Sequence, residues 1–116
     1  MDEIDPIKAL DYIRDNSAAY GKAKAERVWI ENYLKSLKAI LMSEIKPIGD
    51  KEMALGAKEM VAYSHQRYLD QLDALKIAVE KEETLKYLLE GAKMKVEVYK
   101  VQEYTKRTEL RNLHVS

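Results

Sequence analysis

Residues that interrupt helices are scarce in this chain and lie far apart. Its 116 residues include only four Gly and two Pro, and the C-terminal third contains Gly91 and no Pro. An all-β domain needs frequent turns, which Gly and Pro commonly supply, so the composition disfavours a sandwich or a barrel. We therefore predict an all-α protein: a three- or four-helix antiparallel bundle that forms a single helical domain over residues 1–116.

Capping residues predict where the first helix begins. Asp5 can accept the free backbone N–H groups of a first helical turn, and Pro6 fits the first helical position because its missing N–H costs nothing there. Apolar residues then recur at a spacing of three up to about Asn16. Asn16-Ser17 is either a weak break, with Ser17 capping the next helix, or part of one continuous helix.

The second expected helix runs from Ser17 to Lys46 and ends at a Pro-Ile-Gly-Asp turn. In that turn Gly49 can adopt a positive φ, and Asp50 is a candidate cap for a short helix from Lys51 to Ala62. Ser64 is the candidate cap of the helix that follows. The inner face of the short helix is predicted to consist of Met53, Ala57, Met60 and Val61.

Apolar residues of the long helices recur every three or four positions, which places them on one face. The C-terminal pattern covers fewer than four clean heptads, so we expect a long, coiled-coil-like last helix. Glu82 interrupts its face. The favoured interpretation turns Glu82 outward and Leu85 and Leu88 inward, and the alternative is a charged residue that fixes helix register or partner choice. The predicted faces are Ile30, Leu34, Leu37 and Leu41 in one helix, and Leu72, Leu75, Val79, Leu89, Ala92, Val96 and Tyr99 in the other.

The last helix is too long for a compact monomer of this size. From His65 to Arg111 it would extend roughly 70 Å at 1.5 Å per residue, whereas a globule of this size has a diameter of about 35 Å. Either it bends near Gly91 and folds back onto the Trp29–Ile40 stripe, or it projects and pairs with another copy. We predict a homodimer or higher oligomer. The predicted interface residues are Val96, Tyr99, Val101, Tyr104 and Trp29.

Charge sums to zero but is unevenly distributed. Cations pair with phosphates and aromatic rings stack on bases, so the basic C-terminal segment with its interleaved tyrosines is a candidate contact for nucleic acid or a partner protein. Glu97, Glu103 and Glu109 dilute this charge, and a solvated helix face is the commoner explanation. The candidate residues are Lys93, Lys95, Tyr99, Lys100, Tyr104, Lys106, Arg107 and Arg111.

Residue types used in catalysis are poorly represented. The chain has no Cys, and His65 and His114 are its only histidines. No zinc-protease, phosphate-loop or nucleophile-elbow motif is present, and the Glu-x-x-His motif of di-iron bundles is missing. We predict that the protein is not an enzyme and has no cofactor and no metal site. No apolar run approaches 18 residues, and the N-terminus does not resemble a signal peptide, so we expect no membrane span and a cytoplasmic location.

Three stretches of the chain carry a family resemblance. They are Tyr20–Arg27 with Glu31–Ala39, then Ala57–Glu59 with Ala62–His65 and Tyr68, and finally Glu82–Leu88 with Val96–Tyr99. In this order they resemble a group of small, uncharacterised phage and prophage helical proteins encoded near recombination and replication genes. The sequence departs from that group at Tyr99, where a tryptophan followed by arginine is expected. The group has no assigned site, so the resemblance transfers no functional residues.

The resemblance implies a non-enzymatic phage accessory protein in the cytoplasm of a bacterial host. It would act in DNA recombination or replication by binding a phage or host protein of DNA metabolism, with direct nucleic-acid binding as a weaker option. The alternative is an inhibitor of a host defence system or nuclease. The basic C-terminal helix favours the first function, and the acidic segment 50–83, which could occupy a DNA groove on an enzyme, favours the second.

Overall fold

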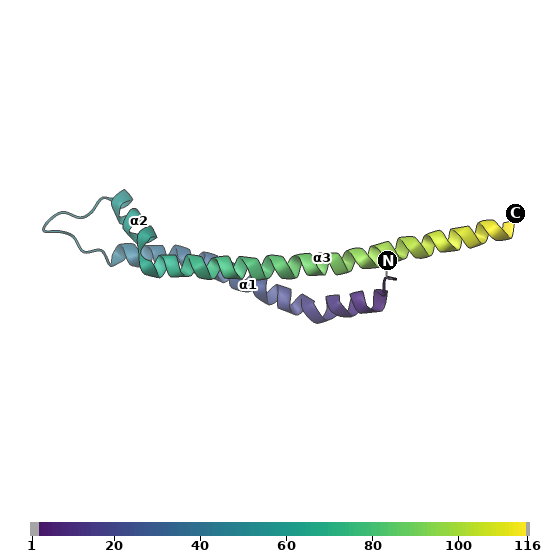
Figure 1. Cartoon of the computed structure of the whole chain (residues 1–116). Helices are drawn as coiled ribbons and strands as arrows, with labels where there is room; N and C mark the ends of the chain where they lie inside the picture. The colour runs from purple at the N-terminus through teal and green to yellow at the C-terminus, as the bar shows by residue number, and fades with distance from the viewer. Residues whose placement is uncertain (1–2, 116) are drawn as a thin grey trace. The chain divides into compact units, whose positions relative to one another are not determined.

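The computed structural model describes residues 3–115, which form three α-helices and no strand (Figure 1). The helix α1 comprises Pro6–Ser43 (38 residues), α2 comprises Leu55–Ser64 (10 residues), and α3 comprises Gln66–Val115 (50 residues). The prediction of an all-α protein is confirmed.

The helix α1 begins where the sequence predicts and then continues without a break. The Asp5 carboxylate accepts the backbone N–H groups of Ile7 at 3.0 Å and of Lys8 at 3.2 Å, as a helix cap should. Neither Asn16 nor Ser17 interrupts the helix, because both side chains donate hydrogen bonds to carbonyl groups four residues earlier. Those bonds remove the alternative of capping a new helix, so the two expected helices are one.

A tight turn follows α1, and α2 begins later than predicted. Ile48 and Lys51 exchange backbone hydrogen bonds of 3.1 and 3.3 Å, and Gly49 adopts a φ of 67°, as the sequence predicts. Asp50 does not cap the next helix, because α2 starts only at Leu55 and no side chain caps it. The predicted inner face of α2 is also wrong: Met60 and Val61 are exposed and Ala57 is exposed, whereas Ala62 is fully buried.

The junction between α2 and α3 is a single extended residue. His65 has φ −67° and ψ 139°, and its ring nitrogen Nδ1 accepts the backbone N–H of Arg67 at 3.0 Å. His65 therefore caps α3, and the predicted cap Ser64 instead donates its hydroxyl to the carbonyl groups of Met60 and Val61 within α2. From Gln66 the helix α3 continues through Gly91 to Val115, so the bend considered at Gly91 does not occur.

The chain forms two compact units that share the two long helices. The hairpin unit is Lys22–Glu82, and the terminal unit consists of the described parts of Met1–Gly21 and Glu83–Ser116. Each unit therefore contains a segment of α1 and a segment of α3.

The core of the hairpin unit joins all three helices. Ile30 and Leu34 of α1 pack with Ala78 of α3 in one buried cluster, and Leu37 and Leu41 pack with Ala62 of α2 in a second. Arg67 at the start of α3 pairs with Glu44 just after α1, while Glu82 pairs with Arg27 earlier in α1. The two helix segments therefore run antiparallel within this unit. The four predicted inward residues of α1 are confirmed: Ile30, Leu34, Leu37 and Leu41.

The buried face of α3 differs from the predicted one in its first half. Leu72 and Val79 are exposed, whereas Ala78 and Glu82 are buried. The favoured expectation for Glu82 is therefore wrong, because its carboxylate is neutralised by Arg27 and needs no turn toward water. Leu88, expected inward, is about half exposed. Buried or half-buried positions follow each other at alternating spacings of three and four: Ala78, Glu82, Leu85, Leu89, Ala92, Val96 and Tyr99.

Candidate functional site

The residues proposed as contacts lie on two sides of α3, and five of the eight share one side. Residues seven apart share a side of a helix. Lys93, Lys100 and Arg107 form one such row, and Tyr104 and Arg111 form a second row directly beside it, three or four residues away. Three further candidates lie elsewhere: Tyr99 is half-buried, Lys106 lies seven residues from it on the same side, and Lys95 lines a groove described below.

Neighbouring carboxylates offset part of this charge. Lys100 Nζ lies 3.2 Å from Glu97 Oε1, and Lys106 Nζ lies 3.8 Å from Glu103 Oε1. In each pair the two residues lie about one helical turn apart on α3. Ion pairs of this kind stabilise a helix by about 0.3 kcal/mol. The acidic dilution expected from the sequence is thus present as ion pairs at two of the candidate cations.

Four of the candidate contact residues do meet in a shallow pocket. The surface hollow of about 380 Å³ is lined by Tyr99, Lys100, Tyr104 and Arg107, together with Glu103. Two cations and two phenol rings within two turns of one helix can bind an anionic group and stack on a planar one. We call these four residues the tyrosine–cation patch: Tyr99, Lys100, Tyr104 and Arg107.

The predicted oligomer-interface residues are divided among different surfaces. Val96 and Tyr99 are half-buried, whereas Val101 and Tyr104 are exposed. Trp29 belongs to the hairpin unit and is 63% exposed, with its ring stacked on Tyr33 at a centroid distance of 5.1 Å. Within the terminal unit, the four predicted interface residues of α3 therefore lie on two different sides of the helix.

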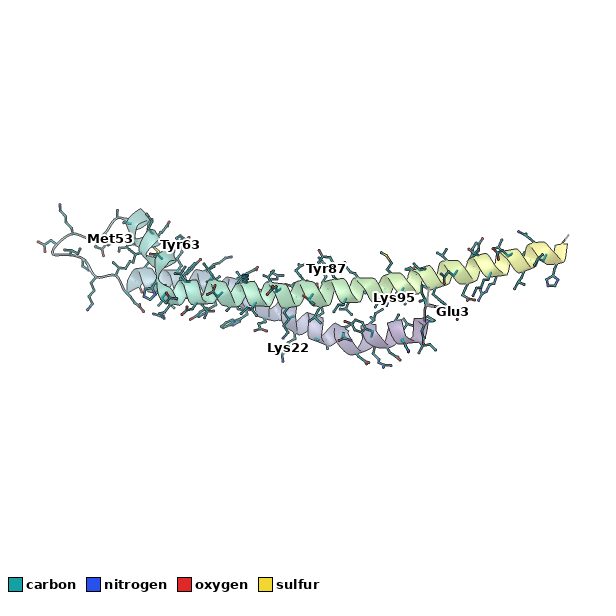
Figure 2. All side chains as sticks on the ribbon, viewed as in Figure 1. Glu3, Lys22, Met53, Tyr63, Tyr87 and Lys95 are labelled. Atoms are coloured by element: carbon teal, nitrogen blue, oxygen red, sulfur yellow. The ribbon has the colours of Figure 1, made fainter. Side chains whose placement is uncertain are left out.

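A second apolar line on α3 was missed by the sequence analysis. Its residues, named at the end of this paragraph, follow each other at alternating spacings of four and three. The side chain of Tyr87, the first of them, projects from the helix in Figure 2. Tyr87 is 64% exposed, Met94 67% and Val101 63%. The heptad spacing was visible in the sequence, but the pattern was assigned to only one face of the helix. The second apolar line is defined as Tyr87, Gly91, Met94, Val98 and Val101.

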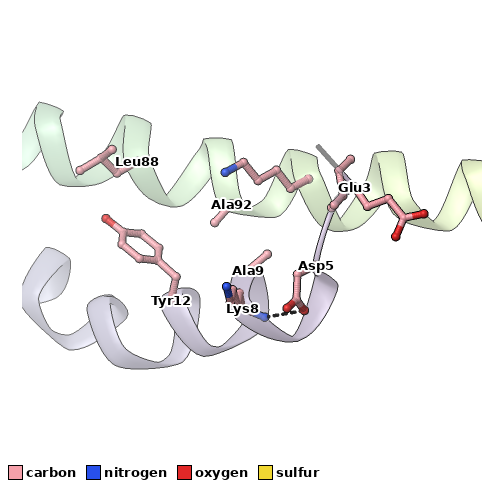
Figure 3. Close-up of a pocket in the computed structure, with 9 residues that line it drawn as sticks. Glu3, Asp5, Lys8, Ala9, Tyr12, Leu88 and Ala92 are labelled. Carbon is pink, nitrogen blue, oxygen red and sulfur yellow. Dashed lines mark hydrogen bonds between the residues drawn. The ribbon is translucent and has the colours of Figure 1, made fainter. Parts of the chain in front are cut away.

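A groove opens between α1 and α3 within the terminal unit. Its volume is about 650 Å³. Figure 3 shows the Tyr12 ring rising from α1 toward Leu88 of α3, and Ala9 facing Ala92. The charged residues Glu3, Asp5, Lys8 and Lys95 also line the groove, so it has an apolar floor with ionic groups of both signs.

One charged cluster lies within the hairpin unit. Arg27 Nη1 donates to both carboxylate oxygens of Glu31 at 3.0 Å, Nη2 donates to Glu82 Oε1 at 3.2 Å, and Nε donates to Glu82 Oε2. Hydrogen bonding to Glu82, and then to Glu31, raises the pKa of Arg27 above its ordinary value. Among the described residues no buried side-chain N or O atom lacks a hydrogen-bond partner. The Arg27, Glu31 and Glu82 side chains are therefore paired with one another.

Residues 3–115 contain neither a candidate metal site nor a candidate membrane-spanning helix. In that range no group of three or more His, Asp or Glu side chains is placed to hold a metal ion. None of the three helices combines the length and apolar content that crossing a membrane requires, again within the described range.

Comparison with known proteins adds no assignment to these surfaces. No protein-family model matches the chain, and no similar curated protein or solved structure is found.

Proposed function

We propose that the chain is a non-enzymatic binding protein that acts through the C-terminal segment of α3. The observation that carries this proposal is a mismatch inside the terminal unit, where α3 contributes about twice as many residues as α1. The shorter segment cannot cover the longer one, and large apolar side chains stay exposed along it. Apolar surface of this kind is characteristic of interaction sites.

The biological setting of the proposal rests on the resemblance to phage accessory proteins. In that setting the protein acts in DNA recombination or replication, in the cytoplasm of a bacterial host, by contacting a phage or host protein of DNA metabolism. The tyrosine–cation patch supports such a role, because it combines two cations with two exposed or half-exposed phenol rings. Direct binding of nucleic acid through the same patch is a weaker form of the proposal.

The alternative, an inhibitor of a host defence system or nuclease, has less support. It depends on the acidic segment 50–83 presenting its carboxylates as a mimic of DNA phosphates. Several of these carboxylates are already neutralised within the chain. Glu82 pairs with Arg27, Glu59 lies 3.7 Å from Lys38, and Glu52 lies 3.8 Å from Lys58.

Site-specific photo-crosslinking in bacterial cells tests the proposal. A photoreactive amino acid at Tyr104, in the tyrosine–cation patch, should capture a protein of DNA recombination or replication, identified by mass spectrometry. The same amino acid at Met60, exposed in the hairpin unit, is the control and should not capture that protein. Capture of a nuclease or defence protein at Tyr104 would support the alternative. Capture of nothing but other copies of this chain would contradict a role through a second protein.

A further inference from the structure

We propose that two copies of the chain pair through the second apolar line of α3, with the two α3 helices parallel and in register. This inference deepens the proposed function, since it assigns one part of the binding surface to self-association. It differs from the sequence prediction, in which the interface shared only Val101 with this line and otherwise consisted of Val96, Tyr99, Tyr104 and Trp29.

The two apolar lines of α3 lie on nearly opposite sides of the helix. At 3.6 residues per turn, the mean direction of Val98 and Val101 lies roughly 160° from the mean direction of Val96 and Tyr99. Ala92, on the same side as Val96, lines the groove together with Ala9 of α1. The α1 segment of the terminal unit is therefore on that side. The second apolar line needs a different partner.

The spacing of the second apolar line identifies that partner as a helix. Apolar residues that alternate at four and three form a seam that another helix fills side chain by side chain. The line from Tyr87 to Val101 spans four helical turns, about 21 Å. Thr84 and Thr105 continue the same positions at its two ends. Gly91 in the middle of the seam has no atom within 4 Å of where a Cβ would be, so a second backbone can approach closely there.

The charged residues beside the seam favour a second copy in parallel orientation. Glu90 and Glu97 border it on one side, and Lys95 borders it on the other. In a parallel, in-register pair each Glu90 lies next to Lys95 of the other copy, because the residue before one seam position faces the residue five further along on the partner. This gives two identical ion pairs, related by the two-fold axis.

The antiparallel arrangement with the best apolar overlap has the opposite charge pattern. Pairing Val98 with Met94 of the other copy places the two Glu97 residues against each other across the seam. Like charges in that position are unfavourable. Parallel pairing also matches each apolar residue with itself, so Tyr87, Met94 and Val101 all meet apolar partners.

Sedimentation equilibrium on matched variants tests the location of the interface. The wild-type protein should have twice the 13.4 kDa mass of the chain at micromolar concentration. Val98→Asp should raise the dissociation constant at least about 100-fold, because each copy would bury a charge in the seam. Val79→Asp, on the same helix and at similar exposure, should leave the dimer unchanged. A monomeric wild type, or a dimer that Val98→Asp does not weaken, would overturn the proposal.

Charge reversal at exposed positions tests the interface without disturbing the fold. Glu90→Lys and Lys95→Glu should each weaken the dimer by roughly 3–10-fold, and the double variant should restore it, since the pairs reform with reversed sign. Each ion pair lies between copies, so the effect should disappear at high salt. Single and double variants of equal affinity would contradict the predicted contact.

Cysteine cross-linking tests the relative orientation of the two α3 helices. The chain has no natural cysteine, so a disulfide can form only at the introduced position. Met94→Cys should form a disulfide-linked dimer under mild oxidation, whereas Lys93→Cys, pointing away from the seam, should not. A dimer that depends on Val98 but is not linked through Met94→Cys would refute the parallel register. These outcomes are independent of the proposed function. A monomer whose Tyr104 captures a DNA-metabolism protein would keep that function and remove this interface.

Discussion

At the scale of single residues, the Arg27 guanidinium holds two carboxylates at once. One of them, Glu82, is only 6% exposed and lies on α3 between the buried Ala78 and the half-buried Leu85. Arg27 occupies the matching kind of position on α1, between Ala23 and Ile30. The charged residue in the buried face of α3 therefore pairs with a charged residue in the facing side of α1. This pair fixes which turns of the two helices meet.

Removing one member of this pair should cost more than removing both. Arg27→Leu leaves the buried Glu82 carboxylate without its partner, and we expect the melting temperature to fall by roughly 5–10 °C. Glu82→Leu should lower it less, because Arg27 keeps its hydrogen bonds to Glu31. The double variant Arg27→Leu/Glu82→Leu replaces the pair by apolar side chains and should recover most of that loss. Thermal unfolding followed by far-UV circular dichroism measures all three.

The exposed pair of Arg14 with Asp15 provides the control for this cycle. Its N–O distance is 3.0 Å, and both side chains are mostly in water. Arg14→Leu should change the melting temperature by no more than about 2 °C, because exposed ion pairs contribute little. If the losses from Arg27→Leu and Glu82→Leu simply add in the double variant, the two residues are not coupled and the interpretation of Glu82 is wrong.

This pair also explains why the sequence alone misplaced Glu82. The sequence of α3 alone indicates that a glutamate among apolar residues turns outward. The sequence of α1 alone shows Arg27 only as one cation in a small basic cluster. The neutralising contact joins residues 55 positions apart, and periodicity within one helix carries no information about such a contact. In contrast, Asp5 was correctly predicted as a cap because a cap acts within two or three residues of itself.

At the scale of elements, α2 is attached to α1 by one small buried residue and a few polar contacts. Ala62 is 0% exposed and packs with Leu37 and Leu41. Lys38 Nζ lies 4.8 Å from the centroid of the Tyr63 ring and pairs with Glu59. Hydrogen bonding to Tyr63, and more weakly the Glu59 charge, raises the pKa of Lys38. These interactions need a charged lysine, so they are complete below pH 10.5 and are lost as the pH rises above the raised pKa.

Enlarging Ala62 should detach or strain α2. Ala62→Leu inserts three carbon atoms where no space remains, and we expect the free energy of unfolding to fall by about 1–3 kcal/mol. Ala57→Leu, exposed on the same helix, should change it by no more than about 0.5 kcal/mol. Urea denaturation followed by circular dichroism gives both values. Equal effects of the two substitutions would contradict the assignment of Ala62 as the anchor of α2.

The existence of α2 could be predicted from its sequence, but its buried face could not. The segment is short and rich in Ala and Met, so several faces of it are nearly equally apolar. The choice among them is made by Leu37 and Leu41 on α1, which accept only a residue as small as Ala62 at close range. Of the two alternatives at Asn16-Ser17, the continuous helix is correct, because both side chains bond back into α1 instead of capping a new helix.

At the scale of the whole molecule, both long helices pass through the two compact units without interruption. The sequence predicted a long last helix correctly, since neither a proline nor a strong cap lies between Gln66 and Val115. It did not resolve how the surface of that helix is divided. The apolar residues of α3 form two lines, and both follow the same spacing in the sequence. Which line is buried becomes clear only once the position of α1 beside it is known.

Salt dependence of nucleic-acid binding distinguishes a functional tyrosine–cation patch from a solvated helix face. If the patch binds single-stranded DNA, affinity should fall steeply as salt rises, with a slope that decreases by roughly 0.7 for each phosphate contact removed. Lys100→Ala and Arg107→Ala should each remove one such contact. Lys106→Ala should have a smaller effect, because Lys106 does not line the pocket of the tyrosine–cation patch.

Removing the competing carboxylates should act in the opposite direction. Glu97→Gln releases Lys100 from its 3.2 Å ion pair, so this variant should bind single-stranded DNA about two- to fivefold more tightly than the wild type. Fluorescence anisotropy of a labelled oligonucleotide at low and at physiological salt measures both sets of variants. Gains from Glu97→Gln together with losses from Arg107→Ala would establish the patch as a phosphate-binding surface. Binding that is absent at low salt, or equal in all variants, would leave these charges as a solvated face and protein contact as the only route by which the chain acts.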